Sequence, residues 1–237
     1  MITSSANPKL RYVRHLERRA FRLREGRMRL EGVRLVEEAL GAGAGVAFAL
    51  VTDDLDRTPR GAALRERLVG MGVPVLDVEP ALLAEVADVA TPQGILAVVS
   101  IPDLPIPAAP TLVLIVDGVR DPGNVGAILR TGDAAGVDAA FLMPGTVDPT
   151  APKVVRAAMG AHFRIPIQRA RWDDLAARVA AGGLAVWVAD AGGTVAHTDV
   201  DWARPSALVF GGEAEGPSDA ALALGRTVRI DMPGGAE

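Results

Sequence analysis

The stretch Leu112-Val-Leu-Ile-Val116, followed by Asp117-Gly-Val-Arg-Asp-Pro-Gly-Asn-Val-Gly-Ala-Ile-Leu-Arg130-Thr131, decides the fold class of this chain. The apolar run predicts a buried strand, and the Gly/Asp/Pro turn after it leads into a helix at about residues 125–135. A continuous apolar strand followed by a helix is typical of a parallel sheet covered on both faces. The sequence therefore predicts an α/β domain that begins near residue 111.

The elements on both sides of this stretch extend the same pattern. In the second half we expect strands at 139–143, 184–189, 207–210 and 228–230, and helices at 153–159 and 175–181. In the first half we expect helix throughout 12–40, strands at 46–52, 73–78 and 95–100, and helices at 60–71 and 80–89. Four prolines within residues 101–110 predict an extended linker. The predicted domains are 1–100, the linker 101–110, and 111–237.

Composition excludes several classes of protein. The 237 residues include no cysteine, so disulfide frameworks and thiolate metal sites are excluded. His15, His162 and His197 lie far apart without metal-ligand spacing, so we expect no metal. No apolar run is long enough to span a bilayer, and the N-terminus lacks the pattern of a signal peptide. We expect a soluble cytoplasmic protein with no membrane partner.

Charge is distributed unevenly along the chain. Residues 1–40 contain nine Arg and one Lys against five Glu, although the whole chain carries a net charge of −4. A basic segment on an acidic chain points to a polyanionic partner. An equally simple interpretation is a solvated helix whose arginines pair with glutamates, and the charge pattern alone leaves both open.

The turn after the first quoted strand combines groups that suit an anionic ligand. Free N–H groups at a helix start attract anions, and Arg130 offers a planar, permanently charged fork six residues after Asn124. The dinucleotide-binding Gly-x-Gly-x-x-Gly pattern is absent. A Gly-rich strand-to-helix turn with a surface arginine would look the same at this level.

Two further stretches carry candidate chemistry. In Leu208-Val-Phe-Gly211-Gly-Glu213-Ala-Glu215-Gly216-Pro-Ser218 a strand runs into two glycines, and ligands of open α/β sheets bind at such carboxyl ends. The alternative is a simple turn before a helix capped by Ser218, with both glutamates solvated. Residues 228–237 form a strand followed by a Gly-rich loop.

Together these stretches resemble the three motifs of the SpoU (TrmH) family of RNA 2′-O-ribose methyltransferases. Asn124, Gly126 and Arg130 match the first motif with its spacing intact, Gly211 and Glu213 the second, and Ile230, Met232 and Gly234 the third. Residues 148–163 also resemble the family. The segments Ile2–Leu10, Glu31-Gly32 and Thr91-Pro92-Gln93-Gly94 resemble the substrate-binding domain of members that modify rRNA. The resemblance covers nearly the whole chain.

The resemblance implies a small N-terminal α/β RNA-binding domain, similar to ribosomal proteins, and a parallel-sheet SPOUT domain with a trefoil knot. It implies a homodimer that uses S-adenosylmethionine to methylate ribose in RNA, and the N-terminal domain favours rRNA, with 23S rRNA as the expected target. The methyl donor would be held around Phe210, Gly211, Gly212, Ile230 and Met232. Phosphates would be bound by Arg11, Arg14, Arg18, Arg19, Arg22, Lys153 and Arg156.

The resemblance also implies the catalytic roles of three residues. Arg130 would orient the ribose-phosphate and stabilise charge on the 2′ oxygen, since a permanently charged guanidinium makes a poor general base. Asn124 would hold Arg130 or the substrate, and Glu213 would order the site.

The sequence departs from the family pattern at three places. Gly212 stands where the family has Asn, Ala214 stands where it has Gly, and the third motif stops at Glu237. If the natural chain ends there, we expect an incomplete knot, exposed apolar surface and weak or absent activity; the favoured interpretation is that the natural chain is longer. Three alternatives stay open: an RNA-binding protein without catalysis, the same chemistry on tRNA, and a different α/β enzyme with its ligand near Gly123.

Overall fold

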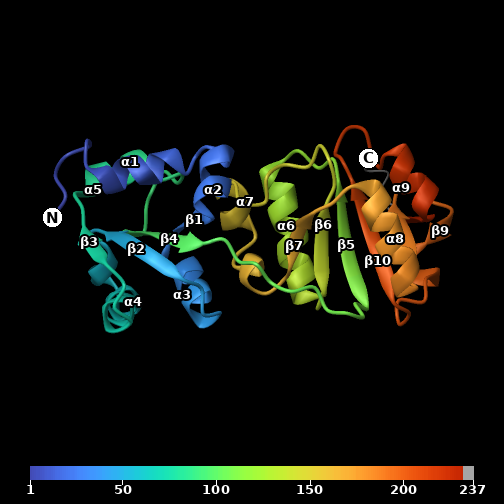
Figure 1. The fold of residues 1–237 in the computed structure, drawn as a ribbon, viewed down its shortest axis with the longest axis horizontal. Coiled ribbons are helices and arrows are strands. Elements are labelled where there is room, and N and C mark those ends of the chain that lie inside the picture. Colours follow the sequence, from blue (N-terminus) through green and yellow to red (C-terminus); the bar gives the residue numbers. More distant parts are fainter. Residues whose placement is uncertain (232–237) are drawn as a thin grey trace. The chain divides into compact units, whose positions relative to one another are not determined.

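The computed structural model describes residues 1–231 and divides them into two compact units (Figure 1). The first unit comprises Met1–Asp103 together with Asp148–Arg164. The second comprises Leu104–Val147 and the described chain from Ile165 onward. The boundary after Asp103 falls inside the predicted linker 101–110, but residues 148–164 lie outside the unit to which the sequence assigned them.

The first unit is a mixed sheet with helices on both faces. Its strands are β1 (Arg27–Glu31), β2 (Val46–Val51), β3 (Val75–Asp77) and β4 (Ile95–Ser100). Its helices are α1 (Pro8–His15), α2 (Arg19–Glu25), α3 (Val33–Gly41), α4 (Pro59–Gly70), α5 (Pro80–Val86) and α7 (Pro152–Ala157). Two short 3-10 turns are η1 (Leu55–Arg57) and η2 (Ala161–Phe163). The strand order is β1-β4-β2-β3, antiparallel except between β2 and β3.

Alternating side chains of these strands build two separate cores. Phe48 and Leu50 point toward α1 and α5, whereas Ala49 and Val51 point toward α3 and α4. Figure 1 shows the two pairs of helices on opposite faces of the sheet. Val155 of α7 and Phe163 belong to the second of these cores, which explains why residues 148–164 are part of the first unit.

The N-terminal region is not the continuous helix that the sequence predicted for residues 12–40. It contains α1, α2 and the strand β1 before α3 begins at Val33. Gly26 (φ 60°) and Gly32 (φ 91°) bracket β1 with backbone conformations that side chains disfavour. Met28 and Leu30 alternate with arginines, and pairing with β4 overrides the helical spacing of the surrounding apolar residues.

The second unit is a parallel sheet of seven strands. The strands are β5 (Leu112–Asp117), β6 (Ala139–Leu142), β7 (Ile167–Arg169), β8 (Ala185–Ala189), β9 (Val195–Ala196), β10 (Ser206–Gly211) and β11 (Arg226–Arg229). The helices are α6 (Pro122–Ala134), α8 (Trp172–Gly182) and α9 (Asp219–Leu224), and η3 (His197–Asp199) is a 3-10 turn. The order β7-β6-β5-β10-β8-β11-β9 is parallel at every pairing. This confirms the predicted parallel α/β class.

Helices cover both faces of this sheet. Val209 and Ala207 of β10 pack in one core with Leu175 and Val179 of α8 and Ala221 of α9. Leu208 and Phe210 point to the opposite face, beside α6. Among residues 1–231, no helix combines the length and the apolar character needed to cross a membrane.

Candidate functional site

The order of the strands places the candidate site at one edge of the second unit. From β5 the chain proceeds to β6 and β7 on one side, whereas β10 lies on the other side, so the direction of winding reverses between β5 and β10. Ligands of open α/β sheets bind at such a reversal, outside the carboxyl ends of the strands. The loops after β5 and β10 carry the first and second sequence motifs, and both begin at this edge.

Glu213 joins the two motif loops through its carboxylate. Oε1 accepts hydrogen bonds from the Asn124 Nδ2 (2.8 Å) and the Asp121 N–H (3.1 Å), and Oε2 accepts from the Arg120 N–H (3.1 Å). One carboxylate thus fixes both the loop after β5 and the first turn of α6. Sequence analysis predicted that Glu213 orders the site, but it paired Asn124 with Arg130 or the substrate instead of Glu213.

The start of α6 is fixed by residues that the sequence analysis did not select. Asp121 is the N-cap, and its Oδ1 accepts from the Asn124 N–H at 3.0 Å, with Pro122 at the first helical position. An Asp-Pro pair before an apolar helix is a recognisable start signal, so the sequence did contain this information. Asp117, at the end of β5, accepts from the Ser218 N–H at 2.8 Å and makes a second link between the loops.

The hydrogen bonds to Glu213 strongly favour its ionised form. The Asn124 amide, followed by the backbone N–H groups, lowers the pKa of Glu213 to about 2. Because this pKa lies below the ordinary value of 4.5, the loop linkage is fully present above that value and is lost as the pH falls through about 2. The carboxylate is therefore charged at neutral pH.

We predict that Asn124→Ala raises the pKa of Glu213, because it removes the largest cause of the depression. The titration midpoint, followed by NMR of the ¹³C-labelled carboxyl group, should move from about 2 toward 4.5. Glu215→Ala is the matched control and should leave that midpoint unchanged, since within residues 1–231 the Glu215 carboxylate bonds only the Arg120 guanidinium. An unchanged midpoint in Asn124→Ala would assign the depression to the backbone donors.

Gly211, the glycine of the second motif, is required by the protein's own backbone, and its neighbour Gly212 is closely packed. A Cβ atom on Gly211 would collide with the backbone of Gly216 and Pro217, and one on Gly212 would lie 2.9 Å from the Gly118 carbonyl oxygen. Gly212 and Gly216 also exchange two backbone hydrogen bonds, of 3.1 and 2.9 Å, which close a tight loop. This packing brings the loop after β10 against the loop after β5.

The residues predicted to hold the methyl donor do not all lie at the same place in the second unit. The Phe210 side chain lines an apolar groove beside α6, so only its backbone faces the same strand end as Gly211. Ile230 follows β11, and its side chain is 67% exposed. Met232 and Gly234 lie outside the described residues.

Arg130 lies apart from the linkage made by Glu213. It is on α6, about 9 Å along the axis from Asn124 at 1.5 Å per residue, and its side chain is exposed. Within residues 1–231 its guanidinium makes no hydrogen bond or ion pair, so the group is available to a ligand.

The predicted RNA-binding residues lie on the first unit, and Arg22 differs from the rest. Its guanidinium is buried and donates to Thr150 Oγ1 (3.0 Å), to the Leu16 and Glu17 carbonyls (each 2.7 Å), and to Asp148. The expected phosphate contact at Arg22 does not fit this burial. The other six side chains, of Arg11, Arg14, Arg18, Arg19, Lys153 and Arg156, are at least partly exposed.

We predict that Arg22→Ala destabilises the protein by about 3 kcal/mol, because it breaks the buried guanidinium's ion pair with Asp148 and removes the donor to the Leu16 and Glu17 carbonyls. The midpoint of urea unfolding measures this loss. Arg18→Ala, on the exposed surface, is the matched control and should change the free energy of unfolding by less than about 0.5 kcal/mol. Equal effects of the two substitutions would contradict a structural role for Arg22.

Two families match successive parts of the chain. Residues 111–237 match the SpoU rRNA Methylase family, and residues 7–97 match the MRM3-like substrate binding domain. The first match covers more than half of the chain and includes both motif loops. The chain belongs to the SpoU rRNA methylase family.

Full-length relatives agree with this assignment. The chain is 32% identical to an uncharacterized tRNA/rRNA methyltransferase of Synechocystis, over 98% of this chain and 85% of that protein. It is 32% identical to the 23S rRNA (guanosine(2553)-2′-O)-methyltransferase RlmP of Bacillus subtilis, over 98% and 90%. The structure of an AdoMet-bound rRNA methyltransferase from Sinorhizobium meliloti superposes with a TM-score of 0.84 at 30% identity, covering all of this chain and 90% of that one.

Proposed function

We propose that this chain transfers a methyl group from S-adenosylmethionine to a ribose 2′-hydroxyl of ribosomal RNA, with 23S rRNA as the substrate. The observation that carries the proposal is the Glu213 linkage between the two motif loops at the reversal of strand order. The match of both units to families named for rRNA methylation and substrate binding supports it.

The described residues fit S-adenosylmethionine in kind. Gly211 and Gly212 lie at the carboxyl end of β10, and the exposed apolar Ile230 follows β11. These two strands lie on either side of β8 in one parallel sheet. Backbone groups at such strand ends recognise an adenine edge, and an apolar side chain covers a ring. S-adenosylmethionine would supply an electrophilic methyl group on its sulfonium, and the rest of the donor would leave as a neutral thioether.

The protein's own task is to activate and orient the 2′-hydroxyl. Arg130 binds the ribose-phosphate and stabilises the negative charge that develops on the 2′ oxygen in this proposal. Its guanidinium is exposed and makes no hydrogen bond or ion pair within residues 1–231. Arg130 cannot take the hydroxyl proton, since it stays protonated, so the proton passes to solvent as the oxygen–carbon bond forms. Asn124 and Glu213 keep the start of α6 in place, which holds Arg130 relative to the donor loop.

We assign RNA binding to the first unit. Arg11, Arg14, Arg18 and Arg19 lie on or next to α1 and α2, with side chains at least partly exposed, and such groups supply salt-dependent affinity for phosphates. Arg14 also bonds Glu85 at 2.7 Å, and Arg156 bonds Asp88 at 2.5 Å. These exposed pairs are weak enough for a phosphate to replace the carboxylate.

We further propose that the protein is a homodimer in the cytoplasm. The groove beside α6 has a volume of about 310 Å³ and is lined by apolar side chains, among them Ile128, Leu208 and Phe210. Apolar surface of this kind on a polar molecule marks an interaction site. Sedimentation at several protein concentrations tests the dimer, and Ile128→Asp should yield a monomer if α6 forms the interface.

Methyl transfer to unmodified bacterial 23S rRNA, 16S rRNA and tRNA tests the proposed activity. With methyl-tritiated S-adenosylmethionine, label should enter 23S rRNA at one ribose and block alkaline cleavage there. Label found only in tRNA would show that the substrate is tRNA and not rRNA. Alkaline cleavage of the RNA next to the labelled nucleotide would exclude methylation of its ribose 2′-hydroxyl. RNA binding without any transfer would favour the non-catalytic alternative.

A further inference from the structure

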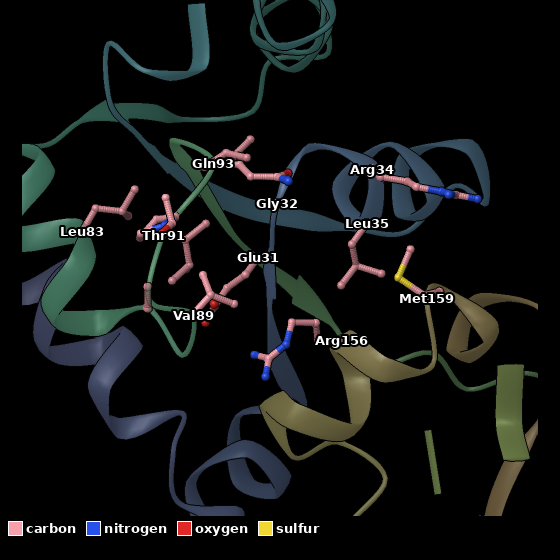
Figure 2. A pocket seen from close by; sticks show the side chains of 14 residues that line it. Glu31, Gly32, Arg34, Leu35, Leu83, Val89, Thr91, Gln93, Arg156 and Met159 are labelled. Carbon is pink, nitrogen blue, oxygen red and sulfur yellow. The ribbon is translucent and has the colours of Figure 1, made fainter. Parts of the chain in front are cut away.

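A cavity of about 280 Å³ lies wholly within the first unit (Figure 2). It is formed by the end of β1, the start of α3, the segment after α5, the loop before β4, and α7 with the residue Met159 that follows it. Its volume is close to the lower end of the roughly 300–1,000 Å³ found for small-molecule sites, so it suits one ring system. The motif segments Glu31-Gly32 and Thr91-Pro92-Gln93 contribute to its wall.

The lining combines apolar walls with a few polar groups. Leu35, Leu83, Val89, Ile95 and Met159 supply apolar surface, and Figure 2 shows Glu31 and Gln93 among them. Arg34 and Arg156 supply positive charge at the cavity. Proteins bind unstacked RNA bases by stacking, including on Arg guanidinium planes, and by hydrogen bonds to the base edges, and this cavity offers arginines and polar groups beside its aliphatic walls.

Glu31 offers a buried acceptor. Its side chain is 8% exposed, and its two oxygens accept from the Asp88 N–H at 3.0 Å each. The Arg29 side chain is 1% exposed, and its Nε lies 3.4 Å from Oε1 of Glu31, so the guanidinium balances the negative charge of the carboxylate. An ionised carboxylate accepts only, with about four lone-pair sites, so a ligand at its free side must present N–H or O–H donors.

Gln93 offers a donor whose orientation is fixed. Its Oε1 accepts from the Val33 N–H at 3.1 Å, at the start of α3. The reversed amide would place two donors against each other, so the NH₂ group must point away from Val33. A carboxylate acceptor, Glu31, and an amide donor, Gln93, thus both lie in the wall of the cavity.

We propose that this cavity binds one unstacked guanine base of the RNA substrate, and this inference rests on the proposed rRNA-modifying function. Guanine carries adjacent imino and amino N–H donors, which match the Glu31 carboxylate, and a carbonyl oxygen on the same edge, which matches the Gln93 amide. Uracil and cytosine lack the paired donors, and adenine has a ring acceptor in the imino position. Arg34, exposed on α3, is placed for the phosphate of the bound nucleotide.

The test uses the full chain and the 5′-monophosphates of guanosine, inosine, adenosine, cytidine and uridine. Methyl NMR follows Leu83, Val89 and Met159 in the cavity wall. The guanosine nucleotide should shift these signals and bind at least tenfold more tightly than the adenosine, cytidine and uridine nucleotides. The inosine nucleotide lacks the amino group and should lose about tenfold, as expected for one good paired contact.

The variant Glu31→Gln should lose the preference for guanosine over inosine. Glu66→Gln, on the exposed face of α4, is the matched control and should keep it. Because the nucleotide series on the unmodified chain needs no variant, a poorly folded Glu31→Gln cannot hide the answer. Equal binding of all nucleotides, or shifts confined to the second unit, would overturn the inference.

Methyl transfer to 23S rRNA by the same preparation separates this inference from the proposed function. Absent guanosine binding with intact methyl transfer would overturn the cavity assignment alone. Guanosine binding in the cavity without methyl transfer to any RNA would retain the site, and the proposed catalytic function would fail.

Discussion

Glu213→Ala lowers kcat/KM for methyl transfer about a thousandfold, which corresponds to roughly 4 kcal/mol of lost transition-state stabilisation. This is the expected result because three donors, the Arg120 N–H, the Asp121 N–H and the Asn124 amide, lose one shared acceptor. Hydrogen bonds to a charged group contribute about 1.5–3 kcal/mol each, and the exposure of Glu213 reduces their sum. Steady-state kinetics with 23S rRNA measures the loss.

Glu215→Ala is the control for this substitution. Glu215 lies two residues further along the same loop and pairs with the Arg120 guanidinium at 3.0 Å, with both side chains largely exposed. Such pairs contribute between zero and about 1 kcal/mol, so we expect less than about a fivefold change. If Glu213→Ala also stays within that range, the linkage between the loops is not needed for catalysis.

Arg130→Ala is expected to lower kcat by about 10²–10³, the usual effect of removing a group that stabilises a developing oxyanion. Because the guanidinium is exposed and makes no hydrogen bond or ion pair within residues 1–231, the urea unfolding midpoint should not change. Calorimetric affinity for S-adenosylmethionine should stay within twofold. Loss of donor affinity in the variant would instead make Arg130 part of the donor site.

Arg130→Lys distinguishes charge from shape. A lysine keeps the charge but loses the planar fork that binds a phosphate through two hydrogen bonds. We expect kcat of Arg130→Lys to be about tenfold higher than kcat of Arg130→Ala. Full recovery would show that charge alone matters, and no recovery would show that the bidentate geometry is essential.

The fold of the second unit was largely predictable from the sequence. The strands β5, β6, β8 and β10 are apolar runs and α6 begins at an Asp-Pro pair, so local signals and tertiary packing agree there. The short strands β7 and β9 were not predicted, because two or three residues carry no periodic pattern. The first unit was harder, because the apolar residues around β1 follow helical spacing. Only the glycines at 26 and 32 indicated that this segment leaves the helix.

The candidate site was predictable in its members but not in its connections. Asn124 and Glu213 are 89 positions apart, and no spacing rule pairs residues that are separated by the four strands β6 to β9. Arg22 shows the reverse difficulty. A run of arginines looks uniform in sequence, but one of them is buried against Asp148, which lies 126 positions away.

The composition of the first unit has a consequence for synthesis on the ribosome. Val155 and Phe163 complete a core whose other residues end at Val99, so a nascent chain that has emerged through Asp103 still lacks part of its interior. At about 5–20 residues per second, the ribosome needs several more seconds to deliver them. During that interval the strands β5 and β6 emerge first, and the apolar surface that awaits α7 is a natural site for a chaperone.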